Sequence, residues 1–262
     1  MFTHLHKQPV VMGILNCTPD SFFDGGTRTS LDAHVAHCAR MIAEGAAIID
    51  IGGYSTRPGY AEISEEEELR RLLPVVRAVR KNFPDIAISI DTFRSGIVRS
   101  VYAEIGTIIV NDISGGEYDS EMLETCGKLA LPYICMHLQD VTQSTDFMSD
   151  MQDFFAQKNA VAQQYNIPQL LLDPGFGFGK TIAQQYELLR RMNEFAHFNL
   201  PILAGLSRKS MIWKTLHCTP QEALNGTTIL NTLALSKGAA ILRVHDVKQA
   251  MECVRLLGFF AS

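Results

Sequence analysis

The most distinctive chemical feature of this sequence is an aspartate between an apolar strand and a glycine-rich loop. It lies in "LLLDPGFGFGKT", residues 170–181. A P-loop for phosphate needs a glycine, four further residues and then Gly-Lys-Ser/Thr. Five residues before Gly179 stands Pro174, which has no backbone N–H to donate to a phosphate. We therefore interpret the glycines as a turn after a buried strand, which leaves Asp173 to be explained, because a buried carboxylate needs a partner.

Polar residues follow not only this apolar run but all eight apolar runs of the chain. The residues are Asn16, Thr56, Arg57, Asp91, Asn111, Asp112, His137, Asp173, Arg208, Lys209, Ser210, Arg243 and His245. Any one of them alone is ordinarily a turn residue or a helix cap. Ligands bind at the carboxyl ends of parallel strands, so together these side chains would converge on one mouth.

These residues divide into two chemical groups. A flat polar ring could be surrounded by Asp91, Asn111, Asp173 and Lys209. An anion could be surrounded by Asn16, Arg57, Arg243 and His245. Asn16 or Asp20 could also contribute to a Mg²⁺ site, because Mg²⁺ is commonly bound by one or two protein oxygens together with phosphate and water.

Other catalytic chemistries fit the sequence less well. Neither Ser207 nor Ser210 has the G-x-S-x-G context of a nucleophilic serine, and there is no HExxH zinc motif. Lys209 could form a Schiff base in principle, but a nearby Asp173 favours the charged ammonium, which is a poor nucleophile.

Composition restricts the class of protein. The chain has 262 residues, of which 47% are hydrophobic, and its net charge of −5 argues against nucleic acid as a partner. No apolar run approaches membrane-spanning length, and we expect no membrane partner. The six cysteines form no Cys-x-x-Cys pair and the N-terminus does not resemble a signal peptide, so we expect a cytoplasmic protein with reduced thiols.

The apolar runs also predict the fold. They are "VVMGIL", "AAIIDI", "IAISI", "TIIV", "PYICM", "QLLL", "PILA" and "AAILRV", and helical segments separate them. Near-continuous apolar strands are typical of a parallel sheet covered on both faces. Eight such units predict a single-domain (β/α)8 TIM barrel over residues 1–262, with an open doubly wound sheet as the alternative.

Three helices have sequence-encoded starts. We expect one from Ser30 as N-cap to Gly45, and one that begins at Ser64 with Glu67 completing a capping box. A third should have Thr219 as its cap and Pro220 as its first residue.

Several blocks of the chain, in order and at the strand ends, resemble the dihydropteroate synthase family. They are "MGILNCTPDSFFDGG", "DIGGYSTRPG", "SIDT", "NDISGG", "LLLDPGFGFGKT", "GLSRKSMI" and "RVHDV". The resemblance implies a (β/α)8 barrel that joins 6-hydroxymethyl-7,8-dihydropterin diphosphate to 4-aminobenzoate. The products would be 7,8-dihydropteroate and pyrophosphate, with Mg²⁺ required. It also suggests a homodimer.

The resemblance assigns roles position by position. The pterin would be held by Asp91, Asn111, Asp173, Phe178 and Lys209. The diphosphate would be held by Asn16, Thr56, Arg243 and His245, with Asn16 also on the metal. The 4-aminobenzoate would be held by Phe22, Arg57, Pro58 and Ser210.

This set of residues predicts where the catalytic difficulty lies. An aniline nitrogen is neutral at pH 7, so the difficult step is departure of pyrophosphate, which Arg243, His245 and Mg²⁺ would stabilise. Asp91 would stabilise the positive charge left on the pterin methylene. We therefore expect a dissociative, cation-like displacement, in which Asp91, Lys209, Arg243 and His245 are the catalytic residues.

Two other functions share part of this pattern. A methyltetrahydrofolate methyltransferase would share the pterin pocket but has no use for the Arg243–His245 anion site. A paralogue that binds pterin without catalysis is opposed by the intact catalytic set. The chain departs from the family pattern at Phe23, at Tyr54 (where Glu is common) and in the loop 138–148.

Overall fold

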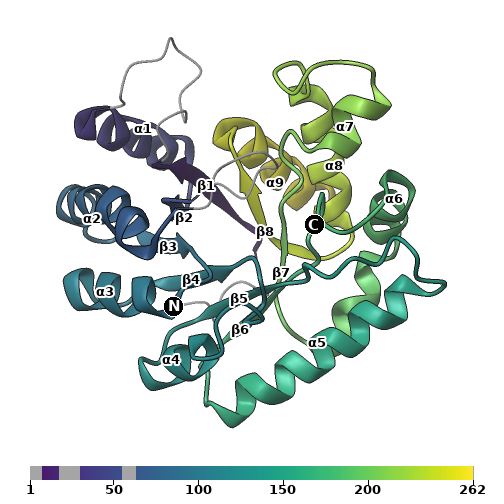
Figure 1. Ribbon diagram of the computed structural model, residues 1–262. Helices are drawn as coiled ribbons and strands as arrows, with labels where there is room; N and C mark the ends of the chain where they lie inside the picture. Colours follow the sequence, from purple (N-terminus) through teal and green to yellow (C-terminus); the bar gives the residue numbers. More distant parts are fainter. Residues whose placement is uncertain (1–7, 18–29, 55–62, 262) are drawn as a thin grey trace.

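The computed structural model is a closed barrel of eight parallel strands with helices around it, and it describes residues 8–17, 30–54 and 63–261 (Figure 1). Each strand pairs with the next in the chain, and the last pairs with the first. The strands are β1 (Val10–Asn16), β2 (Ile48–Gly52), β3 (Ala87–Asp91), β4 (Ile109–Asp112), β5 (Tyr133–Met136), β6 (Leu170–Asp173), β7 (Ile202–Ala204) and β8 (Ala239–Val244). Every apolar run is thus confirmed as a strand, and the open sheet is excluded.

Helices follow the strands and form the outer ring of Figure 1. They are α1 (Leu31–Glu44), α2 (Glu65–Asn82), α3 (Ser95–Ile105), α4 (Met122–Lys128), α5 (Phe147–Gln164), α6 (Ile182–Arg191), the 3₁₀ helix η1 (Met192–Phe198), α7 (Ser210–Thr215), α8 (Leu224–Ser236) and α9 (Val247–Ala261). Among the described residues, no helix is long and apolar enough to cross a membrane.

The helix starts were predicted with mixed success. The Ser30 side chain caps α1, which ends at Gly45 in the left-handed conformation, as predicted. Ser64 caps α2, but the expected capping box is only half formed, because the carboxylate of Glu67 instead accepts hydrogen bonds from Arg70 and Arg71.

The helix expected from Thr219 begins five residues later, at Leu224. Thr219 instead donates its backbone N–H and hydroxyl to one oxygen of Glu222, at 2.9 and 2.8 Å. Arg208 donates to the carbonyl oxygens of Pro220 and Gln221, at 3.2 and 2.9 Å. These contacts hold the segment in a turn, so the prediction of Pro220 as the first helical residue was wrong.

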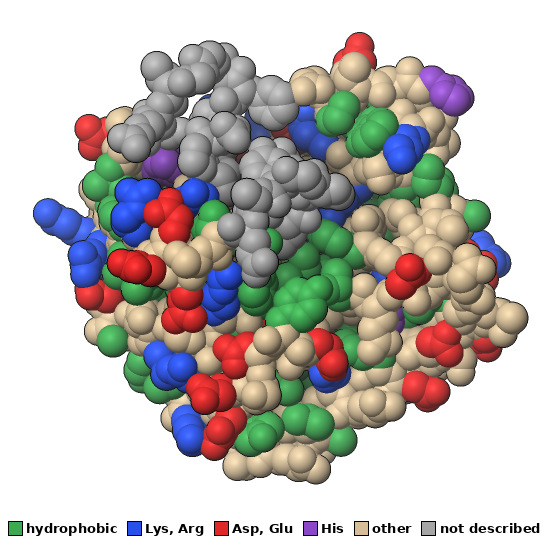
Figure 2. Space-filling model, in the orientation of Figure 1, with side chains coloured by type: hydrophobic (Ala, Val, Ile, Leu, Met, Phe, Trp, Pro, Cys, Tyr) green, Lys and Arg blue, Asp and Glu red, His purple; other side chains and the backbone are tan. Residues whose placement is uncertain are grey.

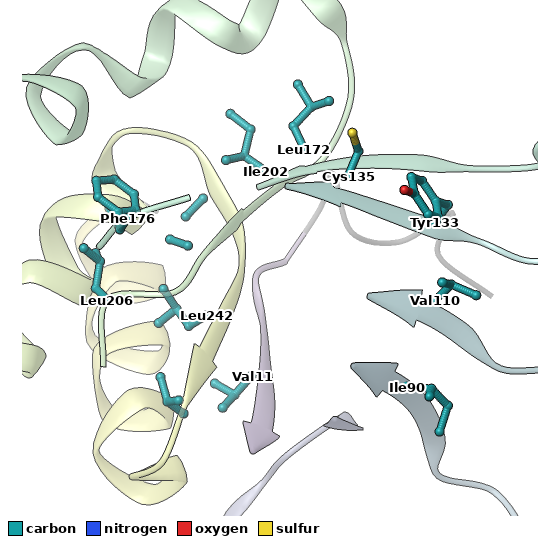
Figure 3. Close-up of a cluster of buried hydrophobic side chains, with 14 of the residues drawn as sticks. Val11, Ile90, Val110, Tyr133, Cys135, Leu172, Phe176, Ile202, Leu206 and Leu242 are labelled. Carbon is teal, nitrogen blue, oxygen red and sulfur yellow. The ribbon is translucent and has the colours of Figure 1, made fainter. Parts of the chain in front are cut away.

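The barrel has two apolar layers, because alternate side chains of a strand point to opposite faces. Outward side chains such as Ile90, Val110 and Tyr133 pack under the helices, and Figure 3 labels these three among the buried side chains that it draws. Inward side chains form a separate apolar floor, which consists of Met12, Ile48, Ile109, Ile134, Leu171, Leu203, Ala240 and Ile241.

Polar groups lie directly above this floor. Two residues after a floor residue, on the same face and nearer the carboxyl end, come Asp50, Asn111, Asp173 and Arg243. Asp112 has the opposite parity and belongs to the outer face, where it accepts a 2.7 Å hydrogen bond from the hydroxyl of Tyr133. The fold therefore collects these four inward polar side chains in one layer at the mouth.

Candidate active site

Arg243 lies between two carboxylates inside the barrel. Its Nε donates to Oδ2 of Asp50 at 2.7 Å, and its Nη2 donates to Oδ2 of Asp91 at 2.7 Å. The Arg243 side chain is 21% exposed, that of Asp91 24%, and that of Asp50 is fully buried. Burial alone would lower the pKa of Arg243, but Asp50 and then Asp91 raise it, so the guanidinium stays charged.

Asp91 ionises unusually for a carboxyl group. Burial raises its pKa to about 7, the positive charge of Arg243 opposes that rise, and Asp50 adds to it. Asp91 is therefore poised to change charge near neutral pH, in contact with the cation at the mouth.

Asp50 was missed by the sequence reasoning. Its Oδ2 accepts from Arg243 and also from Nδ2 of Asn111 at 3.1 Å. One Nδ2 hydrogen is donated to Asp50, which leaves the amide oxygen of Asn111 and its second Nδ2 hydrogen for a ligand. The one signal in the sequence is that Asp50 is the lone carboxylate within the apolar run "AAIIDI". That it follows an inward isoleucine by two residues is known only from the structure.

Asp173 is held by the glycine-rich loop that opens after β6. The backbone N–H of Gly175 donates to Asp173 Oδ1 at 2.8 Å. Gly175 has φ +70°, and a Cβ there would lie 2.2 Å from the carbonyl oxygen of His137, so only glycine fits. Burial raises the pKa of Asp173, while this N–H, Lys209 and Arg243 oppose the rise.

Lys180, the lysine of the apparent phosphate motif, points into the protein. Its Nζ donates to the carbonyl oxygens of His137, Gly175 and Phe178 at 3.3, 3.4 and 3.1 Å. It also lies 3.2 Å from Nδ1 of His137. Burial lowers the pKa of Lys180 to about 8, although Asp173 opposes this. Lys180 therefore ties the loops after β5 and β6 together, and the P-loop interpretation is excluded.

Lys209 lies over the same glycine-rich loop. Its Nζ is 4.2 Å from the centre of the Phe178 ring, a cation–π contact. A Cβ at Gly177 would lie 2.9 Å from Lys209 Cδ, so the backbone approaches this side chain closely. Lys209 and Phe178, each predicted to hold the pterin, thus lie in contact, and Lys209 acts electrostatically on Asp173.

The loops after β7 and β8 are joined by two adjacent links. The Ser207 hydroxyl lies 3.1 Å from Nδ1 of His245. Arg208 makes a bidentate pair with Asp246, with both contacts at 2.9 Å. Arg208 has a left-handed φ of +54°, and this turn leaves its guanidinium on Asp246.

Of the remaining predicted residues, some belong to the part of the chain that the structure describes and some do not. Asn16 is the last residue of β1, beside Gly52 of β2, and Ser210 is the first residue of α7. Phe22, Thr56, Arg57 and Pro58 lie outside the described residues, as does Phe23. Figure 2 shows an apolar patch near the centre of this face of the molecule.

The unusual Tyr54 belongs to an aromatic row at the ends of β2 to β4. Its ring packs edge-on against Phe93, which packs edge-on against Tyr118, each at 5.4 Å between ring centres. The guanidinium of Arg94 lies 5.7 Å from the Tyr54 ring centre and 4.9 Å from that of Phe93. Tyr54, the residue that departs from the family pattern, therefore packs against Phe93 at the end of β3.

Comparison with known proteins shows which family has this arrangement. Residues 12–245 match the family model described as "Pterin binding enzyme". The chain is 45% identical to the dihydropteroate synthase of Escherichia coli K12, over 96% of this chain and 91% of that protein. The chain belongs to the dihydropteroate synthase family.

Solved dihydropteroate synthases have the same fold. The enzyme from Clostridium difficile, crystallised in the presence of pteroic acid, superposes with a TM-score of 0.92 at 40% identity, covering 97% of each chain. The Xanthomonas albilineans enzyme with 4-aminobenzoic acid has a TM-score of 0.91 at 36% identity, covering 98% of this chain and 94% of that one. As a member of the dihydropteroate synthase family, the protein is a transferase.

Proposed function

We propose that this protein condenses 6-hydroxymethyl-7,8-dihydropterin diphosphate with 4-aminobenzoate, giving 7,8-dihydropteroate and pyrophosphate for folate biosynthesis. The observation that carries the proposal is the position of Arg243, which contacts Asp91 and Asp50 at 2.7 Å. Asp50 in turn holds Asn111. A cation thus stands where a polar-ring subsite would meet an anion subsite.

The polar ring of the pterin is the part that the carboxylates would recognise. A pterin presents an amino group and a ring N–H side by side, and one carboxylate can accept both hydrogen bonds. Asp173 takes this role, with Gly175 holding its other oxygen at 2.8 Å. Asn111 and Asp91 contact the ring from β4 and β3, while Lys209 and Phe178 close it from the loops after β7 and β6.

The diphosphate is assigned to Arg243, His245, Asn16 and Thr56. The 4-aminobenzoate carboxylate is assigned to Ser210, with Phe22, Arg57 and Pro58 completing that subsite. Support comes from the chain positions of Arg243, His245, Asn16 and Ser210 at the ends of β8 and β1 and at the start of α7.

Mg²⁺ fits this donor set as an ion that arrives with the substrate. Among the described residues no group of three His, Cys, Asp or Glu side chains could hold a metal, and Asp50 and Asp91 are already engaged by Arg243. Asn16 offers one neutral amide oxygen at the mouth, which suits an ion bound mainly by phosphate oxygens and water. When bound, the ion would neutralise part of the diphosphate charge.

The chain's own residues then favour a dissociative displacement. Arg243 and His245 stabilise the charge that builds on the leaving pyrophosphate. Ionised Asp91 stabilises the positive charge on the pterin methylene. The aminobenzoate nitrogen needs no general base, because it is already neutral and nucleophilic, so no covalent enzyme intermediate forms.

The test is pyrophosphate release by purified protein with the pterin diphosphate, with and without Mg²⁺ and 4-aminobenzoate. Release that depends on aminobenzoate, with dihydropteroate identified by its mass, is the expected result. A folded protein that binds pterin yet forms no product would overturn the proposal in favour of a non-catalytic paralogue.

A second copy of the chain is the partner we propose for the outer face of α8. Leu230, Ala234 and Leu235 of this helix are buried against the barrel. Ile229 and Leu233, four residues apart and so on one side of the helix, are 53% and 46% exposed. A homodimer would cover them, and light scattering should then show a dimer that Leu233→Glu dissociates and Leu31→Glu, on α1, does not. A wild-type monomer would contradict this.

A cytoplasmic location is part of the same proposal. All six cysteines are free. Burial raises the pKa of Cys17, Cys38 and Cys126 to about 12, which keeps these thiols protonated and unreactive.

A further inference from the structure

We propose that Ser207 is a positioning residue that keeps Nε2 of His245 protonated, so that this ring is always a hydrogen-bond donor to the leaving diphosphate. The inference rests on the proposed function for its biological meaning. Ser207 follows β7 and is a buried residue, only 6% exposed. It was excluded at the sequence level as a nucleophile, and its contacts now suggest a different role.

The Ser207 hydroxyl makes two contacts with one residue. Its Oγ accepts the backbone N–H of His245 at 3.2 Å. The same Oγ lies 3.1 Å from Nδ1 of His245. The backbone N–H can only donate, and among the described residues Nδ1 is the one acceptor in contact with this hydroxyl. The hydroxyl proton is therefore donated to Nδ1 when the ring is neutral.

This bonding determines the tautomer. A neutral histidine whose Nδ1 accepts a hydrogen bond must carry its proton on Nε2. If the ring gains a second proton, Nδ1–H can donate to Oγ of Ser207, because a hydroxyl oxygen has two lone pairs. Nε2 therefore carries a proton in both charge states.

A carboxylate in the same place would act in the opposite way. It can only accept, so it would fix the neutral ring as the Nδ1–H tautomer and leave a lone pair on Nε2, which repels an anionic oxygen. The nearest carboxylate in sequence is Asp246, and Arg208 engages both of its oxygens at 2.9 Å. The chain thus provides a neutral orienting partner for His245 and directs the adjacent carboxylate to Arg208.

The experiment compares three variants of the full chain. Ser207→Ala removes the hydroxyl, and Ser207→Thr keeps it. Thr227→Val is the matched control, because the hydroxyl of Thr227 accepts from the backbone N–H of Arg208 at 3.0 Å and so supports the same turn without touching His245. Thermal unfolding of each variant measures any loss of overall stability.

The direct readout is the ¹⁵N chemical shifts of the His245 ring, assigned by their absence from the spectrum of His245→Gln. Wild type, Ser207→Thr and Thr227→Val should show the Nε2–H tautomer at high pH, and Ser207→Ala should shift toward a mixture. Calorimetry with inorganic pyrophosphate and Mg²⁺ measures the affinity for the anion. Ser207→Ala should bind pyrophosphate about tenfold more weakly than wild type, because one net hydrogen bond is lost. Its kcat should fall while the KM for 4-aminobenzoate is unchanged.

Two results would overturn the inference. One is an unchanged tautomer in Ser207→Ala, and the other is an equal loss of pyrophosphate binding in Thr227→Val. The ring shifts and the pyrophosphate affinity are measured without turnover, so they remain decisive even if the wild-type protein forms no dihydropteroate. In that case the proposed function fails and the role of Ser207 is judged separately.

Discussion

Asp50 anchors Arg243 inside the barrel, with its Oδ2 2.7 Å from Nε of the guanidinium. The same oxygen accepts the amide N–H of Asn111 at 3.1 Å, so one buried atom orients a group of the proposed diphosphate subsite and a group of the proposed pterin subsite together. Because Asp50 is fully buried, we expect it to support the residues proposed to contact substrate rather than to contact substrate itself.

Replacing Asp50 with Asn should impair catalysis more than binding of the free pterin. Arg243 would keep Asp91 as a partner but lose its inner anchor, and the amide of Asn111 would face another amide. Loss of such a supporting partner is expected to lower kcat/KM for the pterin diphosphate roughly 10–100-fold. The free energy of unfolding should fall by about 1.5–3 kcal/mol, the value of a hydrogen bond to a charged group.

Asp112→Asn is the matched control for Asp50→Asn. Both aspartates are fully buried in the barrel strands, but Asp112 is on the outer face with Tyr133 and Ser114. The Asp112→Asn variant should unfold at a lower temperature than wild type, but its kcat/KM at 20 °C should stay within about twofold of the wild-type value. If the two variants lose activity equally, Asp50 has no specific supporting role.

Arg243→Ala should separate turnover from pterin binding. The guanidinium would stabilise charge that develops mainly on the leaving group, and removal of an arginine in such a position commonly lowers kcat by about 10³-fold or more. Free dihydropterin, which lacks the diphosphate, should still bind, as measured by its fluorescence. Equal loss of pterin binding and turnover would contradict the division into pterin and diphosphate subsites.

The strand ends could be predicted from sequence because a polar residue directly after an apolar run is visible without any tertiary contact. Asp91, Asn111 and Asp173 were found in this way, and Arg243 lies one residue inside the end of β8. Asp50 escaped because its position within a strand suggests no site until the register shows which face is inward. Strand order, which decides between barrel and open sheet, likewise depends on pairing between distant segments.

The wrong helix start at Thr219 and the omission of Ser207 from the predicted site have a common cause. Local rules assign Thr219 and Pro220 to a helix start, but Arg208 draws the carbonyls of Pro220 and Gln221 away from a helix. The same loop after β7 brings Ser207 to His245, a residue 38 positions away in the chain. Contacts of this length leave no periodic pattern in the sequence.

The pH dependence of kcat/KM should report Asp91. Burial raises the pKa of Asp91 to about 7, with Arg243 opposing the rise. Below that pH the carboxyl is protonated and neutral, so it cannot stabilise a cationic pterin methylene. The rate should therefore increase with pH up to about 7 and then level off. In the Asp91→Asn variant, the residual kcat/KM should no longer rise with pH in this range. If the rise instead came from titration of the substrate, it would persist in the variant.

Gly175→Ala should damage the pterin subsite through the backbone. At φ +70° a Cβ would meet the His137 carbonyl oxygen at 2.2 Å, so the loop must move, and with it the N–H that holds Asp173. Gly238→Ala is the control, because Gly238 also has a positive φ (+94°) but no atom lies within 4 Å of its Cβ position. Strain alone should cost Gly238→Ala about 1–2 kcal/mol of unfolding free energy. Gly175→Ala should cost more than this and should also raise the Kd for dihydropterin about tenfold, the value of one net hydrogen bond. If both glycine variants bind pterin as tightly as wild type, the contact between Gly175 and Asp173 does not organise the pocket.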